Sequence, residues 1–281
     1  MTVKSSIYPI DIETGEVVPG IQMTDEEDRA RRKLFTERQH DKTVRRKDHI
    51  PLGEFYMTTC RENQFEGLQP QDVARLVFLA TFMNYDGVLT SGDKCLAVGD
   101  LPNLLEVSKS TFDRFWKKIK DRYIVESEGG ALTVVSVFLR GKQWHIQERL
   151  TKVFIQQLQA LYRSTPKGKR RLFGYIFQLI YCVNVEYNIL AKNPLETELS
   201  RVEPLTIKEF AARIGYDESQ LSRLEKAYSE VTFMCDGRLQ HFCAFVDHGR
   251  YTDGRFVVIN PRIFYAGRCY EQVDVLGLFF K

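Results

Sequence analysis

The chain has 281 residues, 43% of them hydrophobic, which is enough apolar material for the cores of one or two domains. Its 40 lysines and arginines against 37 acidic residues give a mildly basic net charge of +3. Because no apolar run reaches membrane-spanning length and the N-terminus lacks a basic-then-apolar signal pattern, the sequence excludes a membrane-spanning protein and predicts a cytoplasmic one without a membrane partner.

Residues 1–54 are predicted to form an N-terminal extension ahead of the folded domains. Within it, residues 25–49 are highly charged, and basic residues outnumber acidic ones. Such a run is typical of a solvated helix or arm, and the alternative is a basic arm that contacts DNA phosphates.

Residues 55–142 are predicted to form the first domain. Apolar residues at helical spacing follow Pro70 and predict a helix over residues 71–84. Residues 97–115 then predict two helices around a tight turn, the second capped by Ser108 and followed by a strand at residues 132–135. The predicted outward face of that second helix consists of Lys109, Ser110, Thr111, Arg114, Lys117 and Lys118.

Residues 143–167 are predicted to connect the two domains. Apolar residues recur through residues 142–163 on a stripe typical of one long helix. This helix would pack the domains together or serve as a homodimer surface. The basic stretch of residues 164–171, which contains Pro166 and Gly168, marks the predicted domain boundary.

Residues 168–281 are predicted to form the second domain, beginning with a helix over residues 171–183. Thr206 can cap a helix that Gly215 ends, and Asp217 can cap the helix that follows. Small hydroxyls, an amide and an arginine near a helix N-terminus suit base edges and phosphates in a major groove. The predicted contact residues here are Lys208, Ser219, Gln220, Ser222, Arg223 and Lys226.

An aromatic and β-branched stretch from Gly237 to Arg268 follows these helices, with residues 256–259 as its clearest strand. Turn signals place Arg250 and Arg255 at or near the tip of a hairpin, where they would face DNA phosphates or a minor groove. A helix-turn-helix with such a hairpin is a winged helix.

The segment Ala97–Phe115 matches Thr206–Leu224 without a gap, with acid on acid, apolar on apolar and arginine on arginine. An internal repeat of this length predicts two similar domains. We therefore expect an α+β fold that is mainly α with small antiparallel β wings, in which two tandem winged helix-turn-helix domains are joined by a long helix. The alternative for each motif is an ordinary helical hairpin with a solvated face.

Catalytic signatures are missing from the sequence. It contains no G-x-x-x-x-G-K-[ST] loop, no H-E-x-x-H, no G-x-S-x-G and no His-x-His pair, so we expect no enzyme. The six cysteines form no C-x-x-C pair, which suits a reducing compartment. Cys235, His241, Cys243 and His248 cluster in the sequence, but their spacing fits no zinc module, so neither a metal nor a cofactor is expected.

Residues 256–268 read FVVINPRIFYAGR, an apolar strand followed by Asn-Pro, an apolar group and glycine. This close resembles that of winged replication proteins of the RepL type from Firmicute plasmids, and tandem winged helices are similar to replication initiators of plasmids and phages. The resemblance implies binding of repeated origin sequences in double-stranded DNA and recruitment of host replication proteins.

Two other classes fit the same residues, namely a transcriptional regulator of a mobile element or phage and a protein-interaction module with winged helices as docking surfaces. Among the DNA-binding alternatives, the residue types suggest a division of labour. Lys109, Arg114, Lys117 and Lys118 suit phosphates, whereas Ser219, Gln220, Ser222 and Arg223 suit base edges.

Overall fold

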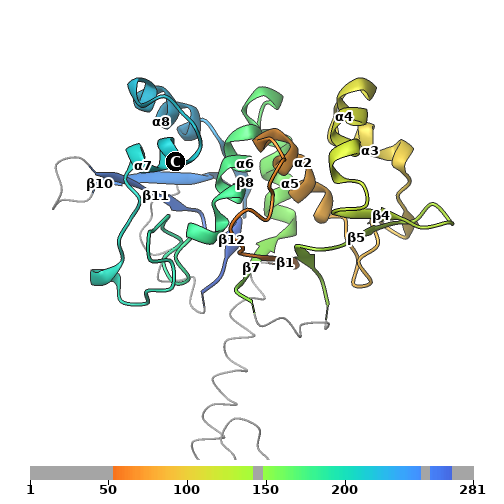
Figure 1. The fold of residues 1–281 in the computed structure, drawn as a ribbon, viewed down its shortest axis with the longest axis horizontal. Helices are drawn as coiled ribbons and strands as arrows, with labels where there is room; N and C mark the ends of the chain where they lie inside the picture. Colours follow the sequence, from red (N-terminus) through yellow and green to blue (C-terminus); the bar gives the residue numbers. More distant parts are fainter. Residues whose placement is uncertain (1–52, 142–147, 248–253, 268–281) are drawn as a thin grey trace, which may run out of the picture. The chain divides into compact units, whose positions relative to one another are not determined.

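The computed structural model describes residues 53–141, 148–247 and 254–267. The chain divides into two units, Met1–Pro51 and Leu52–Lys281, and all described residues belong to the second unit. The predicted N-terminal extension with its basic segment therefore lies outside the described residues, except for its last two positions. The second unit is an α+β fold of helices and small antiparallel sheets, which confirms the predicted class (Figure 1).

Two successive sets of elements make up this unit, and we name them repeat 1 (residues 55–139) and repeat 2 (residues 150–265). The elements of repeat 1 are β1 (Phe55–Thr59), α2 (Pro70–Ala80), β2 (Thr90–Ser91), β3 (Lys94–Cys95), the 3-10 turn η2 (Val98–Asp100), α3 (Leu101–Leu105), α4 (Lys109–Ile119), β4 (Ile124–Glu126), β5 (Leu132–Val134) and β6 (Phe138–Leu139).

Repeat 2 has a similar order with additions, but its described residues form no strands at the place of β2 and β3. Its helices are α5 (Ile155–Ser164), α6 (Arg171–Gln178), α7 (Ile207–Arg213) and α8 (Leu221–Ser229), with 3-10 turns η3 (Lys167–Lys169), η4 (Ile180–Cys182), η5 (Leu199–Arg201) and η6 (Glu218–Gln220). Its strands are β7 (Leu150–Phe154), β8 (Thr232–Cys235), β9 (Arg238–His241), β10 (Cys243–Asp247), β11 (Arg255–Ile259) and β12 (Phe264–Tyr265).

The two repeats meet in one four-stranded sheet with the order β12-β7-β1-β6. The first strands of the repeats, β1 and β7, pair antiparallel at its centre, with Phe55 opposite Phe154 and Thr59 opposite Leu150. The last strand of each repeat then pairs with the first strand of the same repeat, β6 with β1 and β12 with β7. The sheet is therefore arranged alike on both sides of the β1–β7 pair.

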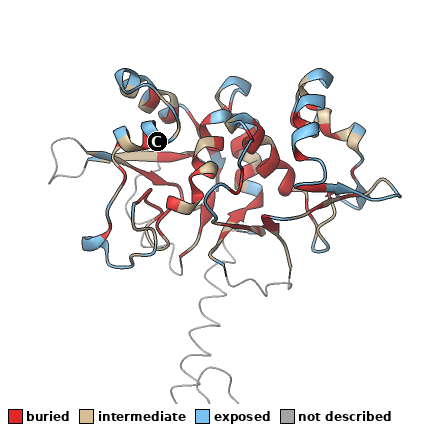
Figure 2. Cartoon of the chain, viewed as in Figure 1, coloured by how far each residue is buried: buried red, intermediate tan, exposed pale blue. Residues whose placement is uncertain are grey.

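Helices α2 and α6 pack against each other and contribute to one hydrophobic cluster that runs through both repeats. Their burial patterns match position by position, from Asp72 and Leu172 to Val77 and Phe177. At the crossing, a Cβ on Gly174 would lie 1.8 Å from the carbonyl oxygen of Pro70, so only glycine allows this approach. Figure 2 shows buried residues concentrated in these central helices, whereas α4 and α8 are exposed on their outer sides.

Backbone hydrogen bonds repeat as well. The amide of Leu89 donates to Leu132 on β5 and its carbonyl accepts from Leu96, while Leu190 donates to Val257 on β11 and accepts from Leu205. The hairpin β10–β11 thus corresponds to β4–β5. These bonds hold the segment before each helix pair, so the repeat seen in the sequence is accompanied by matching backbone contacts in the structure.

The prediction of one long helix over residues 142–163 is wrong. Residues 142–147 lie outside the described residues, and Leu150–Phe154 form strand β7, so only the ten residues Ile155–Ser164 form a helix. The apolar stripe was misleading because strand and helix join without a loop, and Val153 and Phe154 happen to fall in line with Leu158 and Leu161. The Phe154 backbone amide is bound by the carbonyl of Ile263, which is a strand contact.

Other predicted elements occur with changed limits. Helices α2 and α6 end earlier than expected, at Ala80 and Gln178, and a 3-10 turn follows α6. The hairpin β8–β9 was not predicted, although Asp236-Gly237 at its turn, with φ of 51° and 73°, is a strong hairpin signal.

Candidate functional site

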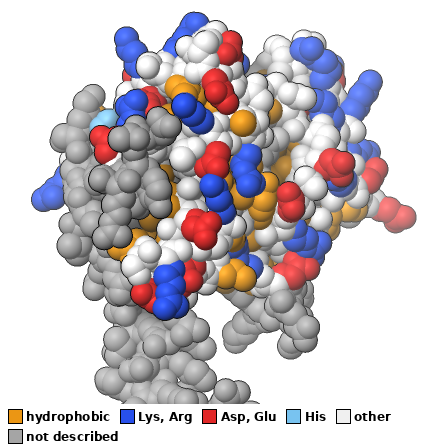
Figure 3. All heavy atoms as spheres, turned by 60° about the vertical axis from the view of Figure 1, so that its left-hand side comes forward, with side chains coloured by type: hydrophobic (Ala, Val, Ile, Leu, Met, Phe, Trp, Pro, Cys, Tyr) orange, Lys and Arg blue, Asp and Glu red, His pale blue; other side chains and the backbone are white. Residues whose placement is uncertain are grey.

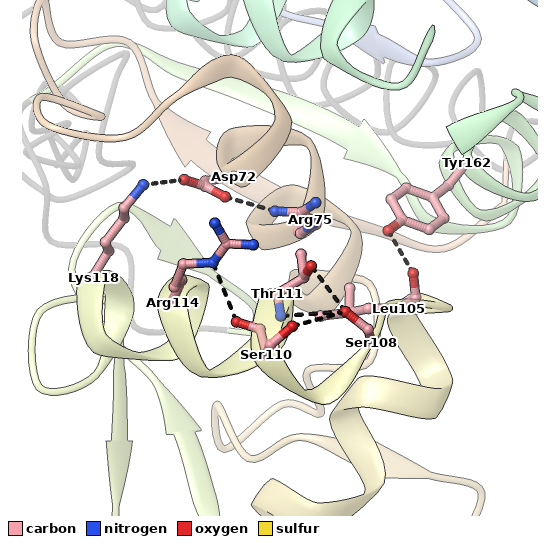
Figure 4. Close-up of polar contacts among 9 residues, drawn as sticks. All are labelled: Asp72, Arg75, Leu105, Ser108, Ser110, Thr111, Arg114, Lys118 and Tyr162. Carbon is pink, nitrogen blue, oxygen red and sulfur yellow. Dashed lines mark hydrogen bonds and ion pairs between the residues drawn. The ribbon is translucent and has the colours of Figure 1, made fainter. Parts of the chain in front are cut away.

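In repeat 1, η2 and α3 form the first helical segment, and α4 forms the second. The amide of Ala97 donates to the Asp100 carboxylate at 2.9 Å, which caps the first segment. Glu106 then takes a left-handed conformation with φ 56° and ends α3. Ser108 accepts from the amide of Thr111 at 3.4 Å, so the predicted cap of α4 is confirmed (Figure 4).

The amphipathic pattern sets which face α4 presents. Phe112, Phe115 and Ile119 are buried. The predicted contact residues lie on the opposite side, with Thr111 half-buried and the others exposed, namely Lys109, Ser110, Arg114, Lys117 and Lys118. Arg114 is held along its own helix, because its Nε donates to the carbonyl of Ser110 at 3.3 Å (Figure 4).

Lys118 is turned toward the protein instead of away from it. Its Nζ lies 2.7 Å from Oδ2 of Asp72 on α2, and Oδ1 of the same carboxylate lies 2.7 Å from Arg75 (Figure 4). The Asp72 side chain is only 5% exposed. This clamp was not predicted, although an acid in the first turn of an otherwise buried stripe is its signal. Lys118 therefore helps to fasten α4 to α2.

In repeat 2, the helix pair α7 and α8 has the caps and the helix stop that the sequence predicts. Thr206 and Glu209 form a reciprocal capping box at the start of α7, with the Glu209 carboxylate 2.9 Å from the Thr206 amide. Gly215 has φ 65°, the conformation that ends the helix. Asp217 accepts from the amide of Ser219 at 2.8 Å, and this bond lowers the pKa of the Asp217 carboxyl.

The second helix of repeat 2 begins later than its counterpart. Asp217 caps the 3-10 turn η6, and α8 starts at Leu221, so Ser219 and Gln220 lie in the turn that leads into α8. The predicted contact residues of this repeat are all exposed, Lys208 on α7, Ser219 and Gln220 on η6, and Ser222, Arg223 and Lys226 on α8. Leu224 and Tyr228 face the core.

Arg255 begins strand β11 and is tied to α8. Its Nη1 lies 2.5 Å from Oε2 of Glu225, whose pKa is raised by burial and partly lowered again by Arg255. The arginine thereby joins the hairpin β10–β11 to the helix. Arg250 and the hairpin tip lie outside the described residues.

The basic link before α6 contains a residue that faces inward. The guanidinium of Arg170 lies 3.9 Å from the ring centroid of Tyr162 and donates to Glu106 at 2.6 Å and to the carbonyls of Leu105 and Thr165. This hydrogen bond from Arg170 lowers the pKa of the Glu106 carboxyl. Arg170 thus joins the turn of repeat 1 to the start of repeat 2.

The surface around repeat 2 is mixed in charge. Figure 3 shows lysine and arginine side chains interspersed with acidic ones across this face, and several basic side chains project at its upper edge. Such projecting cations can bind phosphates without a uniformly basic surface. Among the residues that the structure describes, no group of three or more His, Cys, Asp or Glu side chains could hold a metal, and no helix is long and apolar enough to cross a bilayer.

Comparisons with protein-family models, with curated proteins and with solved structures found no match to this chain.

Proposed function

We propose that the chain binds duplex DNA through two winged helix-turn-helix domains, near residues 55–142 and 168–268, whose recognition helices are α4 and α8. In each, a capped helix pair precedes an antiparallel hairpin, β4–β5 in repeat 1 and β10–β11 in repeat 2. This order of elements supports a winged helix, with the additional hairpin β8–β9 between α8 and β10 in repeat 2.

One observation carries the proposal. A capped pair of helices occurs twice in one unit, and both times the second helix presents hydroxyls and cations to solvent while its apolar residues are buried. A hydroxyl- and arginine-bearing helix start is the chemistry that contacts phosphates and base edges. A merely solvated face would not need this pattern at both places.

The two helices also support different roles. Lys109, Arg114 and Lys117 on α4 suit phosphates, whereas Ser219, Gln220 and Ser222 at the start of α8 suit base edges. We assign sequence preference to repeat 2 and holding to repeat 1. Within this class, the resemblance of residues 256–268 to winged replication proteins supports initiation of replication at repeated origin sequences as the biological role.

The test is duplex binding by the full chain, measured by fluorescence anisotropy over a series of salt concentrations. Because phosphate contacts release counterions, the logarithm of the association constant should fall linearly with the logarithm of the salt concentration. Lys109→Gln combined with Lys117→Gln should reduce that slope by about 2, since each lost phosphate contact reduces it by about 1.

Lys94→Gln combined with Arg201→Gln is the matched control, because both residues are exposed cations outside the two helices. It should leave the slope unchanged. An affinity that does not change with salt concentration would contradict the proposal. So would a control variant that weakens binding as much as the test variant does.

A further inference from the structure

A cavity of about 300 Å³ lies between the start of α6 and α8 in repeat 2. Three cationic residues line it, Lys169, Arg171 and Arg223. None of the described residues that line it is acidic. The cavity therefore combines a concave shape with a concentration of positive charge that its own walls do not neutralise.

The partners of these three cations differ. Lys169 forms an ion pair with Glu230, which does not line the cavity. Arg171 and Arg223 are exposed, and neither forms an ion pair or a side-chain hydrogen bond with any residue that the structure describes. Two guanidinium groups are thus left to bind a ligand, and their planar donor sets match the oxygens of phosphate.

The remaining walls suit an organic group attached to such an anion. Leu172 and Ala227 supply an apolar surface, and Tyr216 and Gln220 supply an aromatic ring and an amide. The volume lies at the lower end of the range for small-molecule sites. Leu172 also belongs to the first turn of the eight-residue helix α6, whose positive end adds to the attraction for an anion.

Repeat 1 shows what fills the corresponding place there. When the repeats are aligned, Asp72 corresponds to Leu172, Lys118 to Ala227 and Arg114 to Arg223. In repeat 1 the carboxylate of Asp72 lies 2.7 Å from both Lys118 and Arg75, so the chain supplies its own anion between α2 and α4 (Figure 4). In repeat 2 an apolar side chain stands where that carboxylate would be, and the cations lie around a cavity.

We propose that this cavity binds the phosphate group of a phosphate ester through Arg171, Arg223 and Lys169. The ester is supplied either by the backbone of bound DNA or by a free nucleotide. The inference goes beyond the proposed function because it gives Arg171 and Lys169, which lie outside both recognition helices, a ligand that need not be a duplex.

The experiment titrates inorganic phosphate and adenosine monophosphate into the full chain in phosphate-free buffer and measures binding by isothermal titration calorimetry. Arg171→Gln and, separately, Ala227→Glu should each weaken the binding about ten-fold or more. The first removes a hydrogen-bond donor to phosphate, and the second places a carboxylate in the cavity. Arg171 is exposed, so its substitution should leave the fold intact, which circular dichroism checks. Arg201→Gln, the same substitution at an exposed arginine that does not line the cavity, should have no effect.

The same variants in the duplex-binding assay distinguish the two sources. If adenosine monophosphate binds more tightly than inorganic phosphate, the cavity takes a free nucleotide. If adenosine monophosphate binds no more tightly than inorganic phosphate but Arg171→Gln weakens duplex binding about ten-fold, the ester belongs to the DNA backbone.

The proposal is overturned if wild-type protein binds neither small ligand and Arg171→Gln leaves duplex affinity unchanged. It is equally overturned if Arg201→Gln weakens phosphate binding as much as Arg171→Gln. A chain that binds no duplex at all would refute the proposed function, whereas the phosphate and nucleotide titrations would still decide this inference.

Discussion

The two repeats support their second helices in different ways. In repeat 1 the clamp of Asp72 with Arg75 and Lys118 fastens α4 to α2. In repeat 2 the corresponding place, between α6 and α8, is a cavity lined by cations. The second helix is therefore held by an ion-paired clamp in repeat 1, whereas in repeat 2 it lies beside an open cavity. Only the cavity leaves cationic side chains available to a ligand.

The turns differ in the same manner. Gly215 takes the left-handed conformation in repeat 2 at no steric cost, whereas Glu106 takes it in repeat 1. Glu106 is held there by Arg170, a residue that follows α5. The turn of repeat 1 thus depends on a residue of repeat 2. The turn of repeat 2 needs no such support, because glycine adopts the left-handed conformation without steric cost.

The largest expected effect tests this dependence. Arg170→Met should lower the free energy of unfolding by about 3–5 kcal/mol. It leaves the buried carbonyl of Thr165 without its donor, leaves the carbonyl of Leu105 with the Tyr162 hydroxyl as its remaining donor, and removes both the ion pair with Glu106 and the stack on Tyr162. Urea unfolding of the full chain measures this loss of stability. Arg163→Met, an exposed arginine on α5, is the control, and an equal loss in both variants would mean that Arg170 does not join the repeats.

The crossing of α2 and α6 gives the second comparison. Gly174→Ala should cost about 2–3 kcal/mol, since its Cβ would collide with the backbone of Pro70. The aligned position of repeat 1 already carries alanine, Ala74, so the close approach is one-sided. Thermal unfolding measures both this variant and its control, Gly99→Ala. The control should be almost neutral, because an added Cβ there meets nothing within 4 Å. A neutral Gly174→Ala would show that the helices can separate at little cost.

The proposed division of labour predicts opposite patterns in DNA binding. Gln220→Ala should cost about 1–3 kcal/mol on the preferred site and little on scrambled duplex, as the loss of a base contact does. Lys117→Ala should weaken both alike. Competition binding on the two duplexes measures this, and a loss of sequence preference in Lys117→Ala alone would exchange the roles of the repeats.

The clamp itself can be opened. Asp72→Asn should cost about 1–2 kcal/mol, because Arg75 and Lys118 lose a charged acceptor while the amide still fills the site. Chemical denaturation of this variant is compared with that of Asp113→Asn, which removes an exposed acid from α4. Equal stabilities would show that α4 needs the clamp no more than α8 needs one.

The smallest effect concerns pH. Arg170 lowers the pKa of Glu106 below its ordinary value of 4.5, so the pair stabilises the fold above that pH and the contribution is lost as pH falls through the lowered value. Because the Glu106 side chain is 46% exposed, the contribution should be below about 1 kcal/mol. Glu106→Gln should flatten the dependence of unfolding free energy on pH below 4.5, and a dependence identical to wild type would contradict this assignment.

The sequence by itself determined the local features. The caps were predicted from Thr206 and Ser108, the turn from Gly215, and the buried faces of both helix pairs from the helical spacing of apolar residues. These features depend on neighbours within one or two helical turns. The exposed residues of α4 and α8 followed from the same periodicity.

Only the tertiary structure decided the rest. Leu150–Phe154 form a strand because β1, far away in the chain, supplies its partner, and no periodicity within the segment records that pairing. Arg170 and Lys118 looked like surface cations, yet each is held by a residue from a distant element, Glu106 and Asp72. The fate of a long cationic side chain depends on whether folding brings an acid within reach, which no local pattern specifies. For Arg171 and Arg223 it brings none among the described residues, and the cavity results.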